Sequence, residues 1–161
     1  MEDKARAREL FFQYDGSRFY MSRDGVEDEY VDYAVPKQLE KQWLEELTQV
    51  KLDLLEQPGN SLVLNFLLNN RDTRHLARIL DATPQGPFGL RCAFLEGVLK
   101  YVELCTRAQA INRVQIREAA DYVLKQAQII SSDVGHDSSD RVRQIIASAN
   151  ELWSSTGGGA Q

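Results

Sequence analysis

The stretch PKQLEKQWLEELTQVKLDL, residues 36–54, carries the clearest helical pattern in the chain. Its apolar residues recur at spacings of three and four, which places them on one face of an α-helix. They are Leu39, Trp43, Leu47, Val50 and Leu54. Pro36 suits the first turn, because its missing N–H is not needed there. We therefore predict a helix that begins at Pro36 and ends before Pro58-Gly59.

Similar patterns lie on both sides of this helix. Residues 3–14 read as a first helix that stops at Asp15-Gly16. Beyond Pro58-Gly59, we expect two short helices with a tight corner, over about 61–68 and 72–80, and then three longer ones. The longer helices begin near residues 90, 112 and 138, and Asn112 with Gln115 resembles a capping box. The Pro- and Gly-rich segment 83–89 is interpreted as a loop between helices.

These elements predict an all-α fold, a single-domain bundle of six or seven helices over residues 1–153. Stacked helical hairpins are an alternative topology, although no 30–45-residue repeat recurs in register. The Gly-rich residues 154–161 are predicted to be a disordered tail.

Residues 15–35 are the exception to the helical pattern, and we call them the N-terminal arm. Two turn signals, Asp15-Gly16 and Asp24-Gly25, bracket a short aromatic stretch for which we expect an irregular or hairpin-like structure. Residues 26–34 fit either an irregular segment or a short helix. Eight of the fourteen aromatic residues of the chain lie in its first 43 positions.

The composition, with 43% hydrophobic and 27% charged residues, is typical of a folded globular protein. No apolar run approaches the ~20 residues that cross a bilayer, and no secretory signal is readable, so we expect a cytoplasmic protein with no membrane association. Cys92 and Cys105 are thirteen positions apart in one helical pattern, too far for a disulfide, and are expected to be free buried thiols.

The net charge of −5 is uneven along the chain. Residues 1–56 hold eight basic and fourteen acidic side chains, whereas the remaining residues hold eleven and ten. This balance disfavours nucleic-acid binding. Arg71, Arg74 and Arg78 nevertheless recur at i, i+3 and i+7, and on one side of a short helix they would form a local anion-binding stripe.

The sequence contains no complete catalytic, metal-binding or nucleotide-binding motif, and we predict no cofactor. Two Asp-x-x-His pairs, at Asp72–His75 and Asp133–His136, resemble half of a di-iron site, but such sites use Glu on helices. The adjacent His136-Asp137 resembles the metal-binding pair of HD phosphohydrolases, which need further ligands. A capping Asp and surface histidines explain these residues more simply.

The function indicated by these features is a non-enzymatic protein-interaction domain. Aromatic side chains beside charged ones are typical of interface anchors, and the arm supplies both. The expected partner-binding residues are Phe19, Tyr20, Tyr30, Tyr33, Glu27, Asp28 and Glu29. The partner is an unknown protein or a second copy of the chain; folding of the arm over the bundle is the alternative.

Two other functions stay open. An enzyme or small-ligand binder could use a pocket between helices built from residues far apart in the sequence. Nucleic-acid binding through Arg71, Arg74 and Arg78 is the third.

Overall fold

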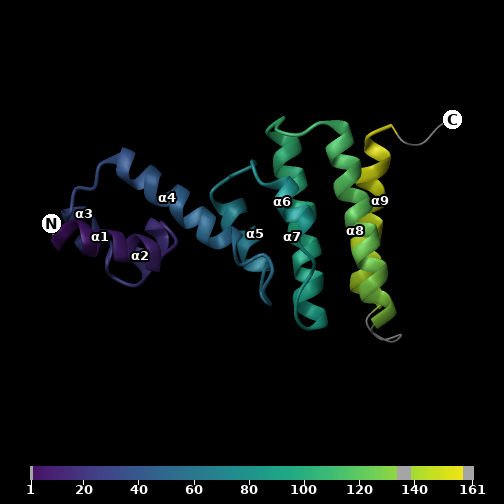
Figure 1. Ribbon diagram of the computed structural model, residues 1–161, viewed down its shortest axis with the longest axis horizontal. Helices are drawn as coiled ribbons and strands as arrows, with labels where there is room; N and C mark the ends of the chain where they lie inside the picture. Colours follow the sequence, from purple (N-terminus) through teal and green to yellow (C-terminus); the bar gives the residue numbers. More distant parts are fainter. Residues whose placement is uncertain (1, 134–138, 158–161) are drawn as a thin grey trace. The chain divides into compact units, whose positions relative to one another are not determined.

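A computed structural model describes residues 2–133 and 139–157, and all the regular structure among them is helical (Figure 1). The all-α prediction is therefore confirmed. The described residues form nine helices, against the six or seven expected. The two additional helices lie in the arm, for which an irregular structure was predicted. The chain forms two compact units, Met1–Leu52 and Asp53–Gln161.

The first unit contains α1 (Glu2–Gln13), α2 (Arg18–Arg23), α3 (Glu27–Asp32) and α4 (Lys37–Leu52). Helix α1 packs on α4, where Phe11 contacts Trp43 with ring centroids 5.7 Å apart. Asp15 and Gly16 end α1 in the left-handed region, with φ of 52° and 68°. A Cβ at Gly16 would lie 2.8 Å from the Phe11 ring, so this turn requires glycine.

The irregular or hairpin-like structure predicted between Asp15-Gly16 and Asp24-Gly25 is wrong, because this segment is helical. Residues 18–23 are the helix α2, and residues 27–32 are α3, the short-helix alternative for that segment. The Ser17 side chain accepts a hydrogen bond from the Tyr20 N–H at the start of α2, and Met21 is fully buried. A capped helix with one buried residue thus replaces the strand that the aromatic stretch suggested.

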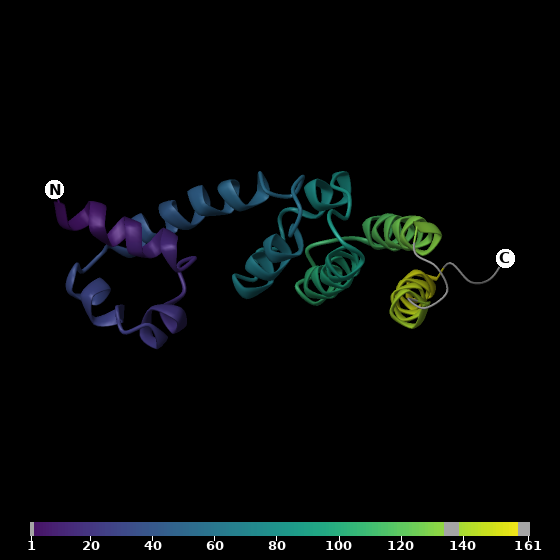
Figure 2. The ribbon, with the colours of Figure 1, turned by 90° about the horizontal axis from the view of Figure 1, so that it is seen from below.

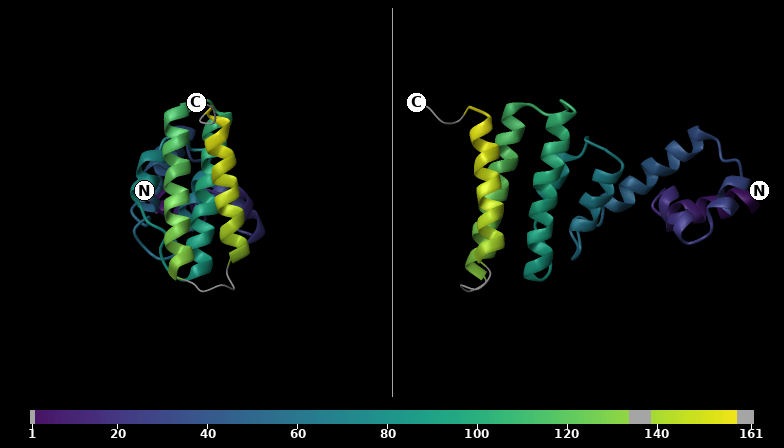
Figure 3. Two further views of the ribbon diagram at one scale, coloured as in Figure 1. Left: turned by 90° about the vertical axis from the view of Figure 1, so that its right-hand side faces the viewer. Right: turned by 180° about the vertical axis from the view of Figure 1, so that it is seen from behind.

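The second unit is built around three long helices, α7 (Phe88–Arg107), α8 (Arg113–Asp133) and α9 (Ser139–Ser155). Helix α8 runs antiparallel to both others, and α9 packs along α8 more closely than along α7 (Figures 1 and 3). The predicted capping box is present, since Asn112 and Gln115 exchange two hydrogen bonds of 3.0 Å. Phe94 and Tyr101 of α7 and Val123 of α8 are fully buried between these helices and their neighbours.

Two shorter helices complete this unit, α5 (Ser61–Asn69) and α6 (Leu76–Asp81), both of which pack on α7 (Figure 2). The two short helices expected here are present, but α6 begins at Leu76 and not at residue 72. At Gly97 the α5 side chain of Leu64 comes so close that a Cβ would meet its Cδ1 at 2.7 Å. Residues 83–87 form the loop expected between helices.

Two predicted boundaries need correction. Helix α4 ends at Leu52, and Val50 and Leu54 are exposed instead of lying on its buried face. At the other end, α9 continues to Ser155, and Thr156 is buried, so the predicted disordered tail does not begin at residue 154. Residues 158–161 lie outside the described part of the chain.

None of the described helices combines the length and the apolar character needed to span a membrane.

Candidate protein-binding surfaces

The arm is divided by the structure into anchored and exposed aromatics. Tyr30 is buried, and its hydroxyl donates a 2.9 Å hydrogen bond to Glu40 Oε1. Arg18 donates to the same oxygen at 2.8 Å and lies 4.2 Å over the Tyr30 ring. Burial and the carboxylate of Glu40 raise the pKa of Tyr30. Tyr30 therefore fixes the arm to α4 and is not available to a partner.

Tyr33 and Glu29 serve a similar purpose at the end of α3. The Tyr33 hydroxyl donates to Glu29 Oε1 at 3.1 Å, and Arg6 of α1 donates to the same atom at 2.9 Å. The Arg6 guanidinium, followed by the Tyr33 hydroxyl, holds the pKa of Glu29 below its ordinary value. These two predicted partner-binding residues thus contribute to the internal structure of the first unit.

Glu27 and Asp28 occupy the first turn of α3, where carboxylates interact favourably with the exposed N–H groups of the helix. This position gives both residues a structural role. Asp28 is exposed and Glu27 half-buried, and neither forms an ion pair among the described residues. They leave negative charge beside α2.

Phe19 and Tyr20 are the predicted aromatic residues that remain at the surface. Phe19 is 73% exposed and Tyr20 is 39% exposed. Their rings pack edge to face with centroids 5.5 Å apart, and Arg23 lies 5.2 Å over the Tyr20 ring. The next residue, Met21, is fully buried, so it anchors to the first unit the helix that carries the aromatic pair.

The three arginines of the predicted anion-binding stripe do not share one helix face. Arg71 lies in the turn after α5 with φ of 51°, Arg74 precedes α6, and Arg78 lies within it. Arg74 pairs with Asp72, and Arg78 pairs with Asp53 at 2.8 Å. Two of the three charges are therefore already neutralised by carboxylates.

Asp72 and His75 belong to a polar corner that joins α5, α6 and α7. Asp72 accepts hydrogen bonds from Arg74 and lies 3.1 Å from His75 Nε2. Arg74 first, and then His75, lower the Asp72 pKa to about 2. The buried Tyr101 hydroxyl accepts from the His75 backbone N–H at 3.0 Å. These hydrogen bonds give Asp72 and His75 a structural role, because they fix the backbone between α5 and α6.

The cysteines and the possible metal ligands are the remaining residues that the sequence suggested for chemistry. Cys92 and Cys105 are free and buried, as predicted, and burial raises the pKa of both thiols. Within residues 2–133 and 139–157, no group of three His, Cys, Asp or Glu side chains could hold a metal ion. His136 and Asp137 lie outside the described residues.

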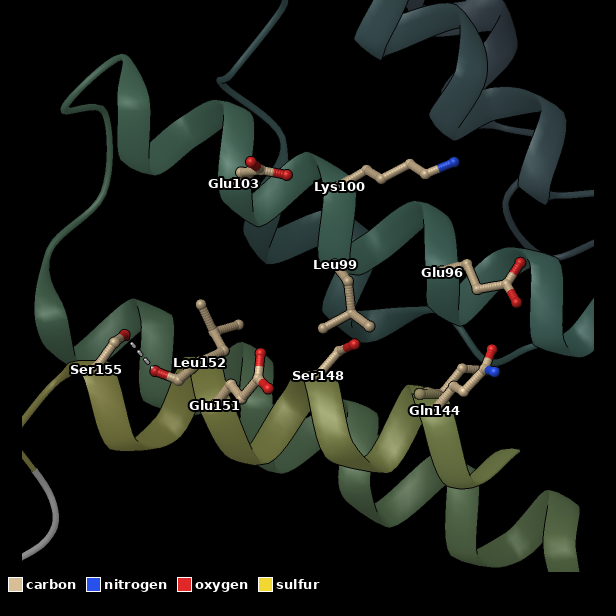
Figure 4. A pocket seen from close by; sticks show the side chains of 10 residues that line it. Glu96, Leu99, Lys100, Glu103, Gln144, Ser148, Glu151, Leu152 and Ser155 are labelled. Carbon is tan, nitrogen blue, oxygen red and sulfur yellow. Dashed lines mark hydrogen bonds between the residues drawn. The ribbon is translucent and has the colours of Figure 1, made fainter. Parts of the chain in front are cut away.

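A groove between α7 and α9 is a surface that the sequence did not reveal. Its volume is about 560 Å³. Figure 4 shows side chains from both helices directed into it. Its lining residues are Glu96, Leu99, Lys100, Glu103, Gln144, Ile145, Ser148, Glu151, Leu152 and Ser155. Neither His75 nor Cys92 reaches it, so the groove does not join those reactive side chains to carboxylates.

The sequence signal of this groove is weak for a physical reason. Its lining positions follow helical spacing on α7 and α9, but most of them are polar. A polar stripe of this kind is also what a solvent-facing helix surface looks like. Only the packing of α7 and α9 against α8 reveals that the two stripes face each other.

Comparisons with known proteins identify no relative. No family model matches the chain, and no curated protein or solved structure matches it.

Proposed function

We propose that this chain is a non-enzymatic protein-interaction domain that binds its partner through Phe19 and Tyr20 on α2. The observation that carries the proposal is the exposed edge-to-face pair of these two rings. The helix that presents them is anchored by the buried side chain of Met21. Aromatic anchors that are rigid before binding lose little conformational entropy in the complex. Exposure at a fixed position is thus what favours a binding role for them.

The surroundings of the pair indicate the chemistry of the partner. Asp28 and Asp32 are exposed on the neighbouring helix α3, and the first third of the chain is acidic. An apolar pocket bordered by lysine or arginine side chains would complement both features. The other arm residues named from the sequence then act indirectly, because Tyr30, Tyr33 and Glu29 hold α2 and α3 against α1 and α4.

The test is photo-crosslinking from position 19 in the source cells. A photoreactive phenylalanine analogue at Phe19 is expected to give one predominant adduct. Excess wild-type chain should compete for that adduct, whereas a Phe19→Ser, Tyr20→Ser double variant should not. Val50, which is 53% exposed on α4, provides the matched control position. Equal labelling from positions 19 and 50 would contradict the proposal.

Light scattering on the purified chain identifies the case in which the partner is a second copy. A dimer that the double variant converts to a monomer would place Phe19 and Tyr20 in a homodimer interface. A dimer that persists in the variant would use another surface.

The groove between α7 and α9 favours a second candidate function, which is binding of another molecule by the second unit. Nucleic-acid binding has less support, because Arg74 and Arg78 are engaged by Asp72 and Asp53.

A further inference from the structure

The helices of the first unit pack mainly in two pairs, α1 with α4 and α2 with α3. The second pair forms one continuous piece of chain, and the Val26 N–H donates a 2.9 Å hydrogen bond to the Met21 carbonyl between its two helices. In the whole arm, residues 15–35, the buried side chains are those of Met21 and Tyr30. The arm therefore has its own local structure but little apolar surface with which to hold α1 and α4.

Charged side chains provide further contacts between the arm and the other two helices. Arg18 of α2 and Tyr30 of α3 both donate to Glu40 of α4. Arg6 of α1 donates to Glu29 of α3 at 2.9 Å. The side chains of these two ion pairs are between 26% and 44% exposed, so each pair contributes only modestly to the attachment of the arm.

Both ends of the arm have a backbone suited to a hinge. Asp15 and Gly16 precede α2 with φ of 52° and 68°, and Ala34 follows α3 with φ of 46°. These residues lie outside the helices, where rotation about a few backbone bonds moves one element relative to another. Changes at the two ends would thus release α2 and α3 without disturbing α1 or α4.

We propose that the arm is a strap that opens as one piece from α1 and α4 while those two helices stay paired. Opening takes Met21 out of the core and the Tyr30 ring away from Phe11, which it contacts with centroids 6.4 Å apart. Since α2 and α3 contain six residues each and short helices are unstable alone, they open together. Opening also releases the helix that carries Phe19 and Tyr20 from its anchor. This regulatory consequence rests on the proposed function, whereas the opening itself does not.

Hydrogen exchange of single amides in the full chain, followed by NMR, tests the strap. The Met21 N–H of α2 donates to the Ser17 carbonyl at 3.1 Å. The Tyr30 N–H of α3 donates to the Val26 carbonyl at 3.1 Å, and we call these two N–H groups the arm amides. If both exchange through one opening, their protection factors should agree within about twofold and lie at least about tenfold below that of Leu47 in α4.

Arg6→Gln distinguishes opening in one piece from fraying of α3. Arg6 contacts the arm through Glu29 of α3 and also pairs with Glu9 within α1. Loss of the contact with Glu29 should make exchange of the Tyr30 N–H about threefold faster. The Met21 N–H should accelerate by the same factor, although the lost contact is on the other helix of the arm.

Two identical changes in α4 provide the matched comparison. Glu40→Gln removes the carboxylate that binds Arg18 of α2, so both arm amides should exchange about threefold faster. Glu46→Gln removes the pair with Arg8, which joins α1 to α4 and not to the arm. It should therefore change the exchange of the arm amides by less than about 1.5-fold.

Several results would overturn the strap. They are unequal protection of the two arm amides, protection of Leu47 no higher than theirs, acceleration by Arg6→Gln confined to Tyr30, and equal acceleration by Glu40→Gln and Glu46→Gln. These measurements need only the purified chain and no partner. The strap can thus fail while crosslinking supports the proposed function, and crosslinking can fail while the strap opens.

Discussion

The first unit of the chain joins short helices through ion pairs and aromatic contacts around a small apolar core, whereas the second packs long helices through a larger apolar core. In Met1–Leu52, ion pairs connect segments that are distant in sequence, including Arg6–Glu29, Arg8–Glu46 and Arg18–Glu40. Arg8 also lies 4.2 Å over the Phe12 ring. Most of these side chains remain partly exposed, so each pair stabilises the unit only modestly.

The second unit packs its long helices through small and apolar side chains. Gly97 lets α5 approach α7, and Ala119, Ala120 and Ala127 are fully buried on α8. The three long helices α7, α8 and α9 contain 17 to 21 residues, while α2 and α3 of the first unit contain six each. Short helices are unstable alone and need ties to their neighbours. The contrast shows how helix length determines which contacts must supply the stability.

Among the variants that test this contrast, Phe94→Ala is expected to cause the largest loss of stability. The ring is fully buried in α7, and its removal should lower the free energy of unfolding of the second unit by about 3–5 kcal/mol. Trp153 fluorescence in a Trp43→Phe background reports on this unit during urea unfolding. Val114→Ala, at an exposed position of α8, should cost less than about 1 kcal/mol. Similar losses for both variants would contradict a closely packed interior.

Gly97→Ala tests the contact between α5 and α7. The added methyl group would meet Leu64 Cδ1 at 2.7 Å and Cβ at 3.1 Å, so we expect a loss of about 1–3 kcal/mol despite the better helix propensity of alanine. Gly89→Ala is the matched control in the same helix, because its Cβ would have only one neighbour, Arg141 Nη1 at 3.9 Å. If both variants are equally stable, α5 and α7 do not approach as closely as described.

The same contrast explains what the sequence could predict. In the second unit, the period of the apolar residues identifies α7, α8 and α9, and the capping box locates the start of α8. Long amphipathic helices repeat their pattern often enough to be read. In the arm, six-residue helices contain fewer than two turns, so Tyr30 and Phe19 look alike in the sequence although one is buried and the other exposed.

The candidate binding surfaces were predictable only in part. Phe19 and Tyr20 were named among the partner-binding residues and are exposed, but their role in binding stays a prediction. The burial of Tyr30 depends on Arg18 and Glu40, whose proximity is a tertiary contact that no local pattern encodes. The groove between α7 and α9 is also a tertiary feature, because each of its walls alone has the pattern of a solvated surface.

Asp72→Asn examines a corner of the second unit that depends partly on charge, as the first unit does. The folded-state pKa of Asp72, about 2, lies below its ordinary value, so its contribution is complete above pH about 4 and is lost as the pH falls through 2. Because Arg74 is largely in solvent, we expect about 1 kcal/mol of additional acid-induced loss in the wild type relative to the variant between pH 5 and 2.

The measurement for this corner is the free energy of urea unfolding at several pH values, again followed by Trp153. Arg74→Gln removes the first cause of the low pKa and should also reduce the acid-induced loss. Identical pH profiles for the wild type and both variants would show that Asp72 does not stabilise the corner through its charge.

Glu40→Gln should have a smaller effect than Phe94→Ala, Gly97→Ala and Asp72→Asn, and it tests the electrostatic character of the first unit. Glu40 accepts hydrogen bonds from both Arg18 and Tyr30, and the variant keeps an acceptor for Tyr30 while losing the ion pair. We expect a loss of about 0.5–1 kcal/mol in dilute buffer that becomes smaller in 1 M NaCl, where salt screens the pair. Trp43 fluorescence in a Trp153→Phe background provides the measurement.

The salt dependence of Glu40→Gln decides between two explanations of the first unit. If the loss is the same at both salt concentrations, the hydrogen-bond geometry at Glu40 matters and its charge does not. Glu46→Gln is the comparison variant, because its partner Arg8 and Glu46 itself are about half exposed, and its effect should be smaller still. A larger effect at Glu46 than at Glu40 would mean that exposure does not govern the strength of these pairs, and the arm would owe its position to Tyr30 burial alone.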